Sequence, residues 1–190
     1  MKALVFEQPR SAAVRELDVP TIAPDEVLVR SRNVGICHSD FELYEGRYII
    51  PISYPIIPGH EWSGEIAEVG ERVTSLKAGD RVVGECVVNG GDDHFGFSIS
   101  GANAEYFVAK ATWLHRIPEE LSFAQGAFVE PFSVAYNRPD ESQHNPKPLR
   151  MPRAKIFNCG VSLFGSSCQM HAVCAVSPSF DRLGSLPCSP

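Results

Sequence analysis

Cys37, His60 and Glu130 are the side chains whose types best suit a metal site in this sequence. A cysteine thiolate, a neutral imidazole and a carboxylate are ligands that zinc takes in proteins, and a catalytic zinc keeps a fourth position open. The spacing of the three residues does not by itself show that they meet. An isolated buried Cys is usually a core residue, and an isolated His is usually a surface or packing residue. The trio is therefore a candidate set of zinc ligands.

Two longer motifs surround these residues. Residues 35–40 read GICHSD, and residues 57–73 read IPGHEWSGEIAEVGERV, so that Glu61 directly follows His60. Residues 79–82 then read GDRV, a Gly-Asp turn of the kind that joins antiparallel strands. The glycines in these motifs are more typical of turns between β-type runs than of ligand contacts.

Together with the Glu-Pro pair at 130–131, these motifs resemble the catalytic domain of the zinc-containing medium-chain alcohol and polyol dehydrogenases. The resemblance covers residues 1–137 and implies a GroES-like, partly open barrel with a catalytic zinc at the mouth of a cleft. It implies that Cys37 and His60 are the first two zinc ligands and that Glu130 is the third. Ethanol-type members have a cysteine at the third position, whereas polyol, threonine and sugar dehydrogenases have a glutamate. The resemblance therefore favours a polyol or related secondary alcohol as the small-molecule substrate.

The same resemblance implies roles for four neighbouring residues. Ser39 matches the hydroxyl that passes the proton of the alcohol towards solvent, and Asp40 matches the carboxylate that orients the ligand histidine. Glu61 matches a carboxylate beside the metal that exchanges with water as a ligand, and His38 matches a residue that approaches the cofactor phosphate. Zinc, as a Lewis acid, lowers the pKa of a bound alcohol and so favours hydride transfer to NAD or NADP. The alternative for Ser39 and Asp40 is a helix N-cap pair.

Two features of the family are not recognisable in this sequence. Most members carry four closely spaced cysteines for a structural zinc, but residues 84–107 contain only Cys86, which is too few for a thiolate site. We therefore expect one catalytic zinc and no structural zinc. No two glycines are spaced i and i+2, so the G-x-G-x-x-G loop of a Rossmann domain, which binds the dinucleotide, is missing.

Short β-type runs separated by Gly and Pro predict a mainly β fold with a few short helices. A helix is predicted over 37–46, and a second over 122–137 that opens with a Ser122/Gln125 capping box and breaks near Glu130, before a proline. The predicted strands cover residues 2–6, 26–36, 63–70, 80–88, 104–109 and 113–117.

Charge and hydropathy exclude some classes of protein. The formal net charge is −6, and no cluster of Lys and Arg suits a nucleic-acid partner. No apolar run approaches the roughly 18 residues of a membrane helix. The expectation is a soluble, cytoplasmic protein that acts on a small molecule, and the resemblance implies a homo-oligomer, as members of the family usually are.

The sequence changes character after Asn137. Residues 1–137 carry a net charge of 11 − 20 = −9, whereas residues 138–190 carry 6 − 3 = +3 and contain 8 Ser, 7 Pro and 4 Cys. This composition suits neither a packed core nor a regular sheet. We interpret residues 138–190 as a divergent, out-of-frame or disordered tail, in which CQMHAVC at 168–174 is a weak zinc or disulfide pattern.

Three functions fit these observations to different degrees. The first is a zinc-dependent, NAD(P)-linked alcohol or polyol dehydrogenase whose chain is truncated. The second is an inactive, isolated GroES-like zinc-binding domain, or a partner of full-length subunits. The third, a zinc-free quinone reductase relative, is disfavoured because Cys37, His60 and Glu130 are all present.

Overall fold

A computed structural model describes residues 1–50 and 52–136. A five-stranded antiparallel sheet, ordered β8-β3-β4-β5-β9, dominates this part of the chain. Its strands are β3 (Glu26–Val34), β4 (Trp62–Val69), β5 (Arg81–Gly84), β8 (Tyr106–Lys110) and β9 (Leu114–Arg116).

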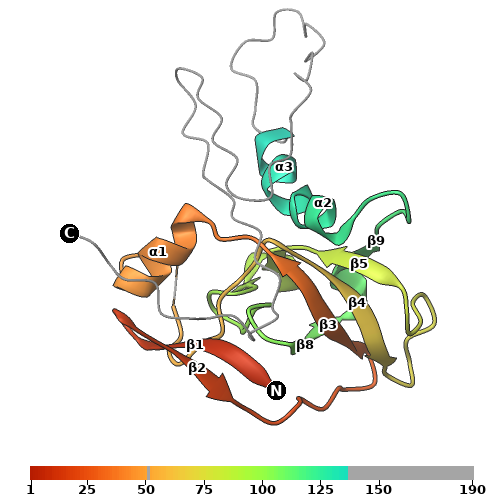
Figure 1. Cartoon of the computed structure of the whole chain (residues 1–190), viewed down its shortest axis with the longest axis horizontal. Helices are drawn as coiled ribbons and strands as arrows, with labels where there is room; N and C mark the ends of the chain where they lie inside the picture. Colours follow the sequence, from red (N-terminus) through yellow and green to blue (C-terminus); the bar gives the residue numbers. More distant parts are fainter. Residues whose placement is uncertain (51, 137–190) are drawn as a thin grey trace, which may run out of the picture.

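Two small hairpins and three short helices complete the architecture. The hairpins are β1 (Lys2–Gln8) with β2 (Ser11–Glu16), and β6 (Val87–Val88) with β7 (Asp93–His94). The helices are α1 (His38–Glu45), α2 (Phe123–Ala127) and α3 (Val129–Tyr136). Figure 1 shows α1 (orange) beside the β1–β2 hairpin and α2 and α3 (teal) next to each other; α2 lies mainly against β3 and β4, and α3 lies against β5. Single 3-10 turns cover Asn89–Gly91 and Ala111–Trp113.

The main core is the inner face of the five-stranded sheet. Apolar side chains that point to this face are buried because successive side chains of a strand point to opposite faces. Aromatic rings fill the centre, where Trp62 lies 4.7 Å from Phe107 and 5.9 Å from Phe95, measured between ring centroids. The core also includes Val27, Val29, Ile66, Val82, Ala109 and Leu114.

A second apolar cluster, formed by Phe6, Leu43, Ile56 and Phe97, holds α1 against the rest of the domain. The helix ends at Gly46, which has a left-handed φ of 72°. A Cβ at this position would lie 2.8 Å from a side-chain carbon of Pro9, so both the conformation and the packing require glycine. The cluster fixes α1, and therefore the loop that precedes it.

The predicted mainly β fold with a few short helices is confirmed, and in the described part of the chain the five strands do not close into a barrel. The predicted strand over 80–88 is split into β5 and β6, with Glu85 and Cys86 between them. Strand β2 was not predicted: all six of its residues pair with β1, but their side chains are half-buried or exposed, so no buried apolar run marks the strand.

The second helical segment breaks two residues earlier than predicted. The Ser122/Gln125 capping box is present, but α2 ends at Ala127 and α3 starts at Val129. Pro131 lies in the first turn of α3, where a backbone N–H has no partner within the helix, so a proline is tolerated there. The interpretation of residues 138–190, including the CQMHAVC pattern, lies outside the described residues.

Candidate metal centre

The candidate centre lies where β3 ends and β4 begins. Val34 pairs with Trp62 at the end of this antiparallel ladder, and the Gly35 N–H donates to the Glu61 carbonyl at 2.6 Å. The segment that follows β3 and the segment that precedes β4 therefore lie at the same end of the ladder. As a result, Cys37 comes next to the His60–Glu61 pair, although the two segments are far apart in the sequence.

Cys37, His60 and Glu61 form a compact group of potential metal ligands. The Cys37 sulfur, a ring nitrogen of His60 and a carboxylate oxygen of Glu61 all lie within 4.8 Å of one another. His60 and Glu61 are only 4% and 2% exposed, and Cys37 is half-buried. Among residues 1–50 and 52–136, this is the group of three or more such side chains that is arranged to hold a metal ion.

The donor atoms of this group fit a zinc ion. Zinc bonds of about 2.0 Å to nitrogen or oxygen and about 2.3 Å to sulfur suit a thiolate, an imidazole and a carboxylate gathered within this span. Glu61 Oε2 and His60 Nδ1 are buried without a hydrogen-bond partner. Buried polar atoms are normally satisfied, so the unpaired Glu61 oxygen in particular marks a place for a cation.

The Asp40 carboxylate lies between the Cys37 backbone and the His60 imidazole. Its Oδ2 accepts a hydrogen bond from the Cys37 N–H at 2.8 Å and completes the capping box at the start of α1. Its Oδ1 lies 3.6 Å from His60 Nδ1, on the far side of the ring from Ser39, whose Oγ is 3.4 Å from Nε2. The N-cap of α1 is Cys37, so the alternative in which Ser39 and Asp40 are an N-cap pair is wrong, although Asp40 takes part in the capping box as its N3 residue.

The titratable groups of the centre interact strongly with one another. Burial alone would lower the pKa of His60, but the adjacent Asp40 carboxylate and Cys37 thiol raise it to about 10. Burial raises the pKa of Glu61 to about 7, although the His60 charge acts in the opposite direction. The protonated His60 ring thus supplies the positive charge among these acidic groups.

Glu130 approaches from a third segment, the first turn of α3. It does not belong to the compact group of Cys37, His60 and Glu61. Its carboxyl is half-buried, and burial raises its pKa, while the charge of His60 lowers it. The charge of His60 thus acts on this carboxyl, although Glu130 lies outside the compact group.

His38 is placed differently from the other predicted residues. It is the first residue of α1 and its ring is largely exposed. Its Nε2 lies 3.6 Å from Glu42 Oε1, and its ring centroid lies 6.4 Å from that of Phe41. The structure thus places His38 on the surface beside the centre and not in it.

Sequence reasoning missed three residues near the centre. The Phe97 ring centroid lies 4.7 Å from that of His60, and Tyr48 stacks on Phe97 with a centroid distance of 4.7 Å. Burial raises the pKa of the Cys86 thiol to about 12, and the nearby charges of Glu130 and Cys37 add to this effect. No motif marked these residues, because they come from loops whose place depends on the tertiary fold.

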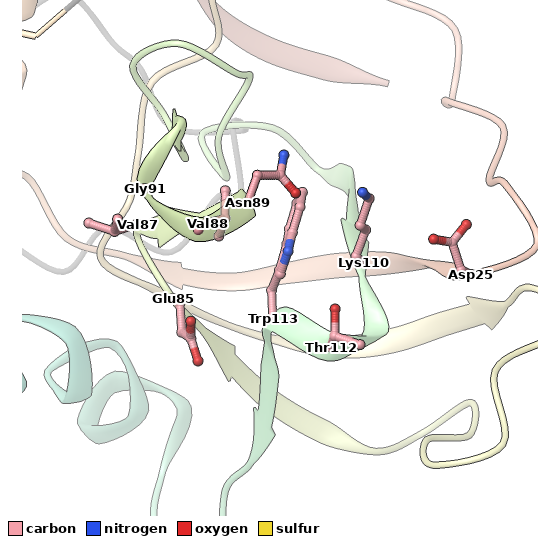
Figure 2. Close-up of a pocket in the computed structure, with 10 residues that line it drawn as sticks. Asp25, Glu85, Val87, Val88, Asn89, Gly91, Lys110, Thr112 and Trp113 are labelled. Carbon is pink, nitrogen blue, oxygen red and sulfur yellow. The ribbon is translucent and has the colours of Figure 1, made fainter.

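A shallow groove lies elsewhere, beside β6 and the 3-10 turn that precedes β9. Figure 2 shows the Trp113 indole between Lys110 and Asn89, and the Lys110 ammonium lies 5.5 Å from the Trp113 ring centroid. None of the candidate metal ligands lines this groove. The chemistry of the side chains, and not the hollowing of the surface, locates the candidate centre.

Comparison with known proteins fits this geometry. Residues 23–119, just over half of the chain, match the family model described as the alcohol dehydrogenase GroES-like domain. The chain belongs to the zinc-containing medium-chain alcohol and polyol dehydrogenase family. The described strands and short helices are therefore those of a GroES-like domain.

Three proteins illustrate the similarity. The alcohol dehydrogenase of Geobacillus stearothermophilus is 39% identical over 67% of this chain, and the sorbitol dehydrogenase of Bacillus subtilis (strain 168) is 37% identical over 70%. The structure of the alcohol dehydrogenase RspB from Escherichia coli CFT073, solved with NADH, matches 72% of this chain and 44% of its own, with 32% identity and a TM-score of 0.66. The chain spans 43% of the length of each of the first two relatives.

No helix in the described ranges, residues 1–50 and 52–136, is both long and apolar enough to cross a membrane.

Proposed function

We propose that this chain provides the zinc-binding catalytic domain of an NAD(P)-linked dehydrogenase that oxidises a polyol or a related secondary alcohol. The observation that carries the proposal is the buried group of Cys37, His60 and Glu61, supported by Asp40, in a domain of this family. The sorbitol dehydrogenase and the NADH-bound alcohol dehydrogenase among the similar proteins support the substrate class and the cofactor.

In this proposal Cys37, His60 and Glu130 hold one zinc ion, and Glu61 exchanges with water as a further ligand. Zinc supplies Lewis acidity when bound, which acidifies an alcohol and makes its carbon a better hydride donor. One thiolate and one carboxylate offset the 2+ charge, so the site does not repel a developing negative charge. We propose no second, structural zinc, because residues 84–107 provide Cys86 as their one cysteine.

The surrounding residues have distinct tasks in the proposed reaction. Ser39 takes the proton of the alcohol, and its 3.4 Å contact with His60 supports a place for its hydroxyl at the edge of the centre. Asp40 holds the His60 ring, and the 3.6 Å contact between them supports this role. His38 contacts the cofactor phosphate, a role that its exposed position beside the centre permits.

A second candidate function is a GroES-like zinc-binding domain without activity of its own, which pairs with full-length subunits. One observation favours it: the 190-residue sequence contains no G-x-G-x-x-G loop for the dinucleotide. Either function suits a cytoplasmic protein, and self-association into a homo-oligomer is compatible with both.

The two candidate functions are separated by activity and metal content measured together. NADH and NADPH formation is followed with a panel of polyols and secondary alcohols, and zinc is determined in the wild-type chain and in Cys37→Ser. The dehydrogenase proposal expects about one zinc per chain, lost in Cys37→Ser, with turnover that is lost in parallel. Zinc binding without turnover supports the second function, and a wild-type chain without zinc contradicts both.

A further inference from the structure

Arg81, from the Gly-Asp-Arg-Val motif, lies outside the metal centre but holds the loop that leads to Glu130. Its Nη1 donates to the carbonyls of Pro118 and Glu119, at 3.1 and 2.9 Å. Its Nη2 donates to the carbonyl of Leu121. All three acceptors belong to the loop between β9 and α2. Because a guanidinium presents its donors in a rigid planar fork, this one side chain fixes the path of the loop.

The same guanidinium also holds the first residue of α2. Its central carbon lies 4.4 Å from the centroid of the Phe123 ring, within the range of a cation–π contact. The guanidinium carbon of Arg32 lies 5.5 Å from the same centroid, and Arg32 forms a 2.7 Å ion pair with Glu65 on β4. Phe123 is therefore held by two arginines that belong to the sheet.

Ser63 ties the start of α2 to the strand that carries Glu61. Its side chain is fully buried, and its hydroxyl donates to the Phe123 carbonyl. At Gly126, a Cβ would lie 3.0 Å from the Ser63 Cβ, which shows that α2 packs directly on this serine. Because Ser63 is two residues after Glu61, the position of α2 is defined relative to the metal centre.

Little freedom remains between α2 and Glu130. A single residue, Phe128, separates the two helices, and its N–H donates to the Gln125 carbonyl at 3.1 Å. Its own carbonyl accepts from the Phe132 N–H at 3.0 Å. The hydrogen-bond ladder thus runs across the break, so a displacement of α2 displaces α3 as well.

We propose that Arg81 is a positioning residue for the metal centre: by fixing the loop and Phe123, it sets α2 and α3 and so the position of Glu130 relative to Cys37 and His60. This inference rests on the proposed function, in which Glu130 is the third zinc ligand. It gives the arginine of the Gly-Asp-Arg-Val motif a task that the motif itself does not reveal.

A double-mutant cycle on the full 190-residue chain tests this proposal, with zinc affinity measured by competition with a chromophoric chelator. Outer residues that support metal ligands typically contribute about 10- to 100-fold to metal affinity. We expect Arg81→Met and Glu130→Ala each to weaken zinc binding by at least about tenfold. The double variant is expected to bind no more weakly than Glu130→Ala, because Arg81 acts through Glu130.

Two further variants make the result specific. Arg81→Lys keeps the charge but loses the planar fork, so it should recover only part of the zinc affinity. Arg15→Met removes an exposed arginine that pairs with Glu7 in the first hairpin, and it should leave zinc affinity unchanged. If Arg81→Met does not fold, as judged by circular dichroism, Arg81→Lys replaces it in the cycle.

The outcomes separate this inference from the proposed function. If Glu130→Ala does not change zinc affinity, the proposed ligand set is wrong. If Glu130→Ala weakens binding while Arg81→Met behaves like Arg15→Met, the role of Arg81 is overturned and the ligand set stands. If the fold-losses in zinc affinity of the two single variants multiply in the double variant, the role of Arg81 is overturned as well, because independent losses indicate a general effect on stability. The cobalt-substituted chain gives a second readout: the visible bands of Arg81→Met should shift as those of Glu130→Ala do.

Discussion

Asp40 is the residue on which the geometry of the candidate centre most clearly depends. One of its oxygens accepts from the Cys37 backbone, and the other faces the His60 ring. The carboxylate is buried, so its charge acts on the imidazole with little screening by solvent. The Asp40 side chain thus contacts both the Cys37 backbone and the His60 ring.

We predict that Asp40→Asn weakens zinc binding by about 10- to 100-fold while the chain stays folded. The amide oxygen still accepts from the Cys37 N–H, so the cap of α1 survives, but the negative charge beside His60 is lost. Chelator competition measures the affinity, and circular dichroism monitors the fold. Asp92→Asn, at an exposed position, is the matched control and should bind zinc as the wild type does. Equal affinities for both variants would contradict the orienting role.

Zinc binding should release protons and strengthen as the pH rises. When no metal is bound, the pKa of His60 is about 10 and that of Glu61 is about 7, so near neutral pH His60 holds a proton and Glu61 is partly protonated. Metal ligands must be deprotonated, so the ion competes with these protons. Each proton displaced makes the apparent affinity rise by about tenfold per pH unit. Titration calorimetry in buffers of different ionisation enthalpy counts the protons, and an enthalpy that is the same in all buffers would rule this out.

At the scale of elements, the Gly-Asp turn between β4 and β5 shows most clearly how a sequence motif fixes the arrangement of strands. Asp80 Oδ2 accepts from the Lys77 N–H at 3.0 Å and from Arg116 Nε at 2.9 Å. Gly79 has a φ of 87°, which the turn needs and which L side chains rarely adopt. The turn thus joins β5 to its neighbours on both sides, since Arg116 belongs to β9.

We predict that Asp80→Asn lowers the free energy of unfolding by about 1–2 kcal/mol at pH 7. Burial alone would raise the pKa of Asp80, but the Lys77 N–H and Arg116 outweigh it and lower the pKa below 3.8. A carboxylate with a lowered pKa stabilises the fold above its unfolded-state pKa, and this stabilisation is lost as the pH falls through its folded-state pKa. The difference from the wild type should therefore shrink below about pH 4.

Urea unfolding at pH 7 and pH 3, with a chelator present, measures this difference. Asp18→Asn, at an exposed position, is the control and should unfold as the wild type does at both pH values. A loss of stability for Asp80→Asn that stays constant from pH 7 to pH 3 would contradict the electrostatic explanation.

Strands and helices were predictable from the sequence where their buried positions are occupied by a recognisable pattern of apolar residues. In β3, Val27, Leu28 and Val29 form a buried run of residues with high strand propensity, so the strand is evident from the sequence. Strand β2 lies at the edge and leaves Val14 exposed, so its residues carry no such pattern. The helix break was misplaced because Pro131 alone does not tell whether a proline ends one helix or starts the next.

The candidate site divides in the same way. Cys37, His60 and Glu61 came from short motifs, and the structure brings them together because the ends of β3 and β4 pair. Glu130 comes from a helix whose place is set by packing, so its position relative to the compact group was not readable from spacing. Phe97 was missed for the same reason, since its contact with His60 is purely tertiary.

On the scale of the whole molecule, the described part of the chain exposes an unusual number of large apolar side chains on one helix. In α3, Phe132 is 58% and Tyr136 is 80% exposed, and Val129 and Val134 are exposed as well. Phe128, just before the helix, continues the same face. Contiguous apolar surface of this kind favours association, because burying it releases water.

We predict that the full chain self-associates in a concentration-dependent way and that Phe132→Ser/Tyr136→Ser raises the midpoint of this association by at least about tenfold. Burying one large apolar side chain contributes about 1.5–3 kcal/mol, and 1.4 kcal/mol corresponds to a factor of ten in affinity. Sedimentation velocity over a range of protein concentrations measures the midpoint. Val14→Ser, which removes an exposed apolar side chain from β2, is the control and should leave the midpoint unchanged. If the double variant and the control associate like the wild type, or if no species associates, the apolar face of α3 does not drive self-association.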